Sequence, residues 1–104
     1  MYAREVSMNL KPNAGNDFTR TIENSILPLL RKQKGFTDEL TLVAPGGRKA
    51  LGISFWDRKE SADAYARDAY PQVLKDLTNV VDGTPLVESY EVSNSTVHKI
   101  ASKK

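Results

Sequence analysis

The chain contains no cysteine, which excludes disulfides, thiolate metal sites and cysteine nucleophiles. No apolar run approaches about 18 residues, so no membrane-spanning helix is expected. The N-terminal residues lack the apolar stretch of a signal peptide. The sequence also has no phosphate-binding loop, no metal-ligand cluster and no Ser-His-Asp set. We therefore expect a cytoplasmic protein that does not bind membranes.

An excess of one charge is also missing. The formal net charge is +2, from 15 basic and 13 acidic residues spread along the chain, whereas nucleic-acid binding requires basic residues clustered on one face. Three of the lysines (Lys99, Lys103 and Lys104) lie at the C-terminal end, as does the only histidine, His98. Nucleic acid is therefore not expected as a partner, and the body of the protein has no histidine base.

The 104 residues are enough for one domain with one core, and hydrophobic periodicity divides them into six elements. Apolar and polar residues alternate over 3–10, which predicts a strand. Apolar residues then recur every three or four positions from Phe18 to Leu30, which predicts a helix capped by Asn16 or Asp17. Pro28 should kink this helix.

The remaining elements follow the same reasoning. The expected order is a strand over 37–44, a glycine turn at 45–48, a strand over 49–56, a helix from Asp57 to Leu77 broken at Tyr70-Pro71, a turn at 82–85 and a strand over 86–93. The order βαββαβ predicts an α+β, ferredoxin-like fold, in which a four-stranded antiparallel sheet carries both helices on one face.

The two faces of this sheet differ in polarity. The face expected to pack under the helices is the strongly apolar one: Val6, Met8, Leu10, Leu40, Leu42, Leu51, Ile53 and Phe55. The opposite face is mixed and holds Glu5, Ser7, Asn9, Thr41, Val43, Ala50, Gly52, Ser54, Trp56, Ser89 and Glu91. A second subunit laid across the mixed face would bury Trp56, so a homodimer through the sheet face is expected.

Three segments carry a resemblance to a known family. They are Gly35-Phe36, Ile53-Ser-Phe-Trp-Asp57 running into Glu60-Ser-Ala-Asp-Ala-Tyr65, and Val87-Glu-Ser-Tyr-Glu-Val92. The chain resembles the antibiotic-biosynthesis-monooxygenase-like domains of the dimeric α+β barrel superfamily over roughly residues 3–93. The expected domain is 1–93, and 94–104 is expected to be a weakly ordered basic tail.

The resemblance also implies candidate site residues. Cofactor-free quinol oxygenases of this superfamily have Asn, Trp and Tyr pocket residues, for which Asn9, Trp56, Tyr65 and Tyr70 are the counterparts. Haem-degrading members resemble the chain at Asn9, but Lys75 stands where they have the haem-ligating histidine. Because a lysine is normally protonated at neutral pH, the comparison argues against haem. No metal, flavin or other cofactor is implied.

Two functions are compatible with these residues. The first is a cofactor-independent monooxygenase-like protein acting on an aromatic or quinol-type small molecule. Such chemistry requires an aromatic-lined pocket, a hydrogen-bond donor for the developing oxyanion and a proton acceptor; Glu5 or Glu91 could accept the proton if burial raised its pKa. The second is a non-catalytic dimeric module that binds a small apolar ligand. In that reading Trp56, Tyr65 and Tyr70 are packing residues and Asn9 satisfies a turn.

Overall fold

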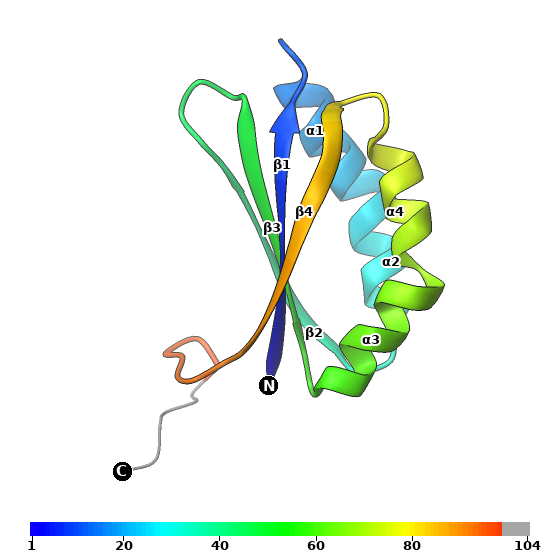
Figure 1. Ribbon diagram of the computed structural model, residues 1–104, viewed down its shortest axis with the longest axis vertical. Helices are drawn as coiled ribbons and strands as arrows, with labels where there is room; N and C mark the ends of the chain where they lie inside the picture. Colours follow the sequence, from blue (N-terminus) through cyan, green and yellow to red (C-terminus); the bar gives the residue numbers. More distant parts are fainter. Residues whose placement is uncertain (99–104) are drawn as a thin grey trace.

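The computed structural model describes residues 1–98. Its elements are β1 (Tyr2–Leu10), α1 (Gly15–Thr21), the π-helix η1 (Ile22–Ile26), α2 (Leu27–Arg31), β2 (Phe36–Val43), β3 (Lys49–Trp56), α3 (Lys59–Asp68), α4 (Tyr70–Leu77) and β4 (Val81–Glu91). The four strands form one antiparallel sheet in the order β2-β3-β1-β4, and the helices cover one face of it (Figure 1). The ferredoxin-like α+β prediction is confirmed.

Each of the two predicted helices is interrupted close to its proline. Pro28 lies at the start of α2, and the turn before it is a π-helix in which the Leu27 N–H donates to the Ile22 carbonyl. The expected kink is therefore absorbed as a wide turn, since Pro28 has no N–H of its own. The second break is confirmed at Ala69, whose φ of −121° separates α3 from α4 immediately before Tyr70-Pro71. Within residues 1–98 no helix is long and apolar enough to cross a membrane.

The helix starts differ slightly from those expected. Helix α1 begins at Gly15 with Ala14 as its N-cap, and α3 begins at Lys59 with Arg58 as its N-cap. Neither N-cap residue makes a side-chain capping hydrogen bond. The predicted caps at Asn16 or Asp17, and the predicted opening of the second helix at Asp57, are therefore wrong by one to three residues.

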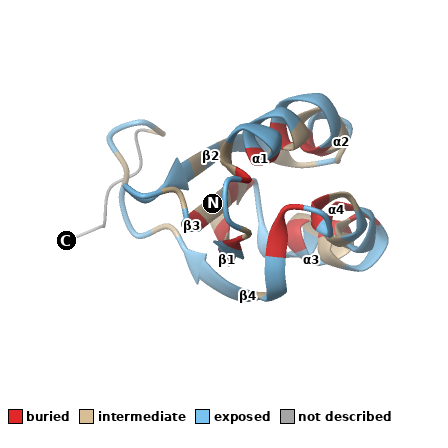
Figure 2. Ribbon diagram, turned by 90° about the horizontal axis from the view of Figure 1, so that it is seen from above, coloured by how far each residue is buried: buried red, intermediate tan, exposed pale blue. Residues whose placement is uncertain are grey.

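The core lies between the sheet and the helices (Figure 2). Trp56, Phe18 and Leu10 are its largest fully buried side chains. The ring of Trp56 stacks on Tyr65 of α3 at 4.9 Å between centroids and meets Phe36 edge-on at 5.6 Å. These contacts connect the ends of β2 and β3 to α3.

The predicted assignment of sheet faces is wrong for β2, β3 and β4. Ser89 and Glu91 of β4, expected on the open face, pair with Arg4 and Tyr2 on the helix side, and Trp56 is buried in the core of the single chain, so no second subunit is needed to bury it. Tyr2 of β1 pairs with Trp56, and Val6 pairs with Gly52, so the even-numbered residues of β3 share the helix side with Val6 and Met8. The large aliphatic residues Leu40, Leu42, Leu51 and Ile53, together with Phe55, therefore lie on the open face. The small residues Ala50, Gly52 and Ser54 face the helix layer instead, and Ala50 is buried beneath it. The open face is consequently more apolar than the sequence predicts.

The expected turn at 82–85 is part of a strand. Strand β4 runs from Val81 to Glu91, and its pairing with β1 shifts register between Ser7, opposite Leu86, and Asn9, opposite Asp82. Gly83 has φ +71°, so the extra residues form a bulge within the edge strand, where such irregularities are common.

The described part of the C-terminal segment lies against the open face of the sheet. His98 Nε2 is 2.6 Å from Asp38 Oδ2, and its ring lies 4.8 Å from that of Phe55. The His98 side chain is only 11% exposed. Of the expected weakly ordered tail, residues 94–98 are thus seen beside β2 and β3, and the expectation for 99–104 lies outside the described residues.

Gly35 joins the helix layer to the sheet and provides a stability prediction. Its φ is +82°, and a Cβ at this position would lie 2.6 Å from the Cβ of Ser61. We expect Gly35→Ala to lower the free energy of unfolding by about 3 kcal/mol, since a strained backbone and a steric clash add up. Gly46→Ala is the control, because Gly46 also has positive φ but open space around it; about 1 kcal/mol is expected there. Urea denaturation of both variants measures the difference, and equal losses would contradict the contact with Ser61.

Candidate functional site

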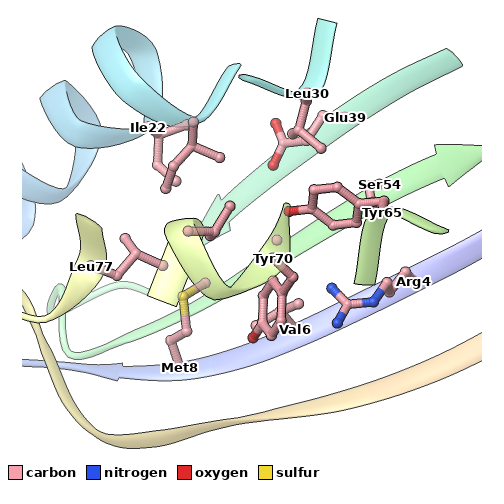
Figure 3. A pocket seen from close by; sticks show the side chains of 13 residues that line it. Arg4, Val6, Met8, Ile22, Leu30, Glu39, Ser54, Tyr65, Tyr70 and Leu77 are labelled. Atoms are coloured by element: carbon pink, nitrogen blue, oxygen red, sulfur yellow. The ribbon is translucent and has the colours of Figure 1, made fainter. Parts of the chain in front are cut away.

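A small cavity lies between the sheet and the helices that cover it, with η1 and α2 on one side and α3 and α4 on the other (Figure 3). Its volume is about 40 Å³, which is room for one or two waters. Its lining is mostly aliphatic, with a few polar groups: Arg4, Val6, Met8, Ile22, Ile26, Leu30, Glu39, Gly52, Ser54, Tyr65, Tyr70, Val73 and Leu77. An apolar cavity with a few convergent polar groups is the usual form of a small-molecule site.

The polar groups of the sheet come from a single row across the strands. Glu39 of β2 pairs with Ser54 of β3, and Ser54 pairs with Arg4 of β1. All three side chains lie on the helix side, because the row of Ala3, Phe55 and Asp38, which separates them from the row of Tyr2, Trp56 and Phe36, points to the open face. Adjacent strands are about 4.8 Å apart, so Glu39 and Arg4 are separated by roughly 10 Å at the backbone. The row therefore has a carboxylate at one end of the cavity, a hydroxyl in the middle and a guanidinium at the other end.

Arg4 is the buried cation of this row. Its residue exposure is 6%. The guanidinium carbon lies 4.0 Å from the ring centroid of Tyr70 and 5.4 Å from that of Tyr65, which are cation–π distances. Within residues 1–98 no carboxylate forms an ion pair with it.

Glu39 is the carboxylate of the row. Burial raises the pKa of Glu39 above its ordinary value, and a 2.6 Å hydrogen bond donated by the Thr41 hydroxyl opposes that rise. A carboxylate with a raised pKa is a better proton acceptor near neutral pH than an ordinary one, provided that it is ionised. Glu39 is therefore suited to take a proton from a group in the cavity.

Tyr65 and Tyr70 form the wall contributed by α3 and α4. Burial raises the pKa of Tyr65 to about 12, the positive charge of Arg4 opposes the shift, and the charge of Glu39 adds to it. Burial also raises the pKa of Tyr70, again opposed by Arg4. Both phenols are therefore neutral hydrogen-bond donors at physiological pH. The Tyr70 hydroxyl is buried and makes no hydrogen bond of normal geometry within residues 1–98.

The structure brings some of the predicted site residues together and separates others. Tyr65 and Tyr70 line the cavity, with rings 6.1 Å apart. Trp56 stands behind Tyr65 and does not line it. Asn9 is exposed between the buried residues Met8 and Leu10, so its side chain points to the open face of the sheet. Lys75 is exposed on α4. Within residues 1–98 no group of three or more metal-ligating side chains occurs.

Sequence reasoning missed Arg4 and Glu39. Arg4 sits in an alternating strand among apolar residues, a signal that it points into the core and not to solvent. The position of Glu39 depends on a bulge. The pairing of β2 with β3 shifts between Phe36 and Asp38, and this shift places Glu39 on the helix side. Of the expected proton acceptors, Glu5 lies on the open face opposite Glu88, and Glu91 is exposed at the end of β4.

Comparison with known proteins places this geometry in a fold group. No family model and no curated protein matches the chain. A solved monooxygenase from the gene ActVA-Orf6 of Streptomyces coelicolor, in complex with nanaomycin D, aligns with a TM-score of 0.76 and 11% identity over 90% of this chain and 88% of its own. A cofactor-independent oxygenase from Streptomyces nogalater, SnoaB, aligns with a TM-score of 0.74 and 12% identity. The alignment covers 91% of this chain and 95% of the SnoaB chain.

A third solved structure, of a protein of unknown function from Nitrosomonas europaea, aligns with a TM-score of 0.75 and 17% identity over 91% of both chains. At these identities the likeness concerns the fold. The chain has the fold of the antibiotic-biosynthesis-monooxygenase-like proteins, as the resemblance of its sequence motifs predicts.

Proposed function

We propose that the protein is a cofactor-independent monooxygenase that oxidises an aromatic or quinol-type small molecule in the cavity between the sheet and the helices. The observation that carries this proposal is the convergence of Glu39, Arg4 and two neutral tyrosines on one otherwise apolar space. Two proteins of the same fold are described as a monooxygenase bound to nanaomycin D and as a cofactor-independent oxygenase, which supports the same reaction class.

The residues present account for the proton transfers that such a reaction needs. Glu39 accepts a proton from the acidic C–H or O–H of an anthrone or hydroquinone, leaving a delocalised anion. For an anthrone, the anion gives one electron to O₂, and the resulting radical and superoxide combine to form a C–O bond. The proton on Glu39 returns to the peroxide, which then loses water and leaves a quinone carbonyl. One atom of O₂ ends in the product and the other in water. Tyr65 and Tyr70 donate hydrogen bonds to the negatively charged oxygens.

The cavity has to widen for a substrate to bind. Pockets for small molecules usually measure about 300–1,000 Å³, against about 40 Å³ here. The helix layer has two irregular points beside the cavity, since Ile22 and Ile26 of the π-helix and Tyr70 after the break at Ala69 all line it. We propose that the layer moves away from the sheet at these two points.

The test is an oxygen-electrode assay with a panel of anthrones and hydroquinones. With an anthrone we expect consumption of one O₂ for each quinone carbonyl formed, well above the rate in buffer. No consumption above the buffer rate with any member of the panel would contradict the proposal.

The small volume of the cavity, about 40 Å³, favours a second candidate, a non-catalytic module that binds a small ligand. In this case the tyrosines and Arg4 serve to bind and not to react. Saturable binding of an anthrone without oxygen consumption would establish the second candidate in place of the first.

We further propose that two copies associate through the open sheet face. Leu40, Leu42, Leu86 and Tyr90 are 52%, 49%, 73% and 50% exposed on it, and Leu51, Ile53 and Phe55 lie between them. Monomeric proteins rarely expose an apolar surface of this extent. A two-fold dimer covers the same face on both copies, which suits a single sheet whose other face is already covered by helices.

The dimer proposal is tested with two neighbouring residues of β4. We expect Leu86→Lys to raise the dimer dissociation constant about 100-fold, because each copy loses about 1.5 kcal/mol of apolar burial at the interface. Val87→Lys is the control, since Val87 lies on the helix side of the same edge strand and should leave the dimer intact. Sedimentation velocity at micromolar concentration measures both, and a monomeric native protein would contradict the proposal.

A further inference from the structure

Arg4 is a buried charge whose counter-charge is missing from the described chain. Buried charges in proteins are normally paired with an opposite charge or a metal, because removing an ion from water is costly. The Arg4 guanidinium lies close to the rings of Tyr65 and Tyr70, and within residues 1–98 no carboxylate pairs with it. Glu39 also lines the cavity, but it lies on β2, and strand β3 separates it from Arg4 on β1.

Two neighbours of Arg4 bring hydroxyl groups to the lining of the cavity. The Ser54 hydroxyl accepts a 2.9 Å hydrogen bond from Trp56 Nε1, and because a hydroxyl has one proton of its own to donate, Ser54 can donate into the cavity beside Arg4. The Tyr70 hydroxyl is buried without a hydrogen bond of normal geometry in residues 1–98. Figure 3 shows the side chains of Arg4 and Tyr70 close together at one side of the cavity, with Glu39 at the other. Arg4 and Tyr70 thus lie at one end of the cavity, and the Ser54 hydroxyl stands next to Arg4 in the middle of the row.

We infer that Arg4, Ser54 and Tyr70 form an anion site that selects aromatic ligands carrying an acidic oxygen already ionised at neutral pH, an enolate-type hydroxyl or a carboxylate. The inference rests on the proposed function in that it concerns the ligand of the same cavity. The anionic oxygen supplies the counter-charge for Arg4 and accepts hydrogen bonds from Ser54 and Tyr70. The rest of the ring system extends toward Glu39, about 10 Å away along the sheet, which places the carbon to be oxidised at the opposite end from the anion.

The experiment compares two probes of nearly equal size. 2-Hydroxy-1,4-naphthoquinone is an anion at neutral pH, and 2-methoxy-1,4-naphthoquinone is its neutral counterpart. Both are already oxidised quinones, so they report binding without turnover. Isothermal titration calorimetry at pH 7 gives the affinities, and the emission of Trp56, the only tryptophan, provides a second signal because its ring stacks on Tyr65.

We expect the native protein to bind the hydroxy probe at least 10-fold more tightly than the methoxy probe, as charge-assisted hydrogen bonds require. Arg4→Met should bind both probes equally. Arg4→Lys retains the charge and should retain part of the preference, which also covers the case in which the Met variant does not fold. Ser54→Ala should reduce the preference without abolishing it.

Three results would overturn the inference: equal affinity of the native protein for both probes, an unchanged preference in Arg4→Met, or no binding of either probe at millimolar concentration. The outcome is independent of the oxygenase test. A preference for the anion without oxygen consumption leaves the anion site standing and removes the oxygenase. Oxygen consumption with neutral quinols, together with equal affinity for both probes, leaves the oxygenase standing and removes the anion site.

Discussion

Replacing Glu39 by Gln is expected to lower the rate of oxygen consumption with an anthrone about 100- to 1,000-fold, the usual contribution of one proton acceptor. Gln has nearly the same size and keeps an oxygen for the hydrogen bond from Thr41, but it cannot take a proton. Glu23→Gln is the matched control, because Glu23 is exposed on the π-helix and does not line the cavity. Its rate should equal that of the native protein.

The pH dependence of the rate gives a second signature of Glu39. A proton acceptor works only as the carboxylate, so the native rate should rise with pH through a midpoint above the ordinary 4.5 of a glutamate, since burial raises the pKa of Glu39. In Glu39→Gln this acid limb should disappear. A variant that keeps both the native rate and the acid limb would show that the proton goes elsewhere.

The same substitution has a predicted effect on stability. The pKa of Glu39 is higher in the folded state than in the unfolded chain. Its contribution to the free energy of unfolding is therefore fully present at pH values below the unfolded-state pKa, and it is lost as the pH rises through the folded-state pKa. Glu39→Gln should therefore gain stability relative to the native protein as the pH increases from about 4 to 7. Urea denaturation at several pH values measures this, and the opposite slope would contradict the burial of the carboxylate.

Replacing Trp56 by Ala is expected to lower the free energy of unfolding by about 3–5 kcal/mol, the range for a large aromatic residue removed from a core. Trp56 is completely buried, stacks on Tyr65, meets Phe36 edge-on and donates to Ser54. It therefore connects the end of the sheet to α3. Thermal or urea unfolding measures the loss, and a change below about 1 kcal/mol would contradict its role as a packing residue.

Trp56→Phe separates packing from catalysis. A phenylalanine keeps most of the stacking but loses the hydrogen bond to Ser54, so a loss of about 1–2 kcal/mol is expected. Since Trp56 does not line the cavity, the rate of this variant should remain within about 10-fold of the native rate, far less than the effect at Glu39. A loss comparable to that of Glu39→Gln would mean that Trp56 acts on the substrate after all.

The fold was predictable because its signals are local. Alternation along 3–10 and 49–56, helical spacing from Phe18 to Leu30, and the breaks at Pro28 and Pro71 each depend on a few neighbouring residues. The order βαββαβ then leaves few possible topologies. What could not be predicted was the side of the sheet that the helices cover, because β3 carries apolar residues on both faces and the choice depends on how closely the helices approach Ala50 and Gly52.

The candidate site was predictable only in part for the same reason. Tyr65 and Tyr70 follow from helical periodicity and do line the cavity. Glu39 depends on a bulge between Phe36 and Asp38 that changes the parity of β2, and no local residue pattern announces that bulge. The alternation of β1 places Arg4 on the same side as Val6 and Met8, but charged side chains are usually exposed, so the charge of Arg4 argues against this position.

The central claim is that an aromatic ligand occupies the cavity between the sheet and the helices. Methyl NMR with 2-hydroxy-1,4-naphthoquinone tests it most directly, because cavity and open face have different methyl groups. We predict intermolecular NOEs from the ring protons to Met8, Ile22 and Leu30, which line the cavity. NOEs confined to Leu40, Leu42 and Leu86 on the open face would contradict the claim.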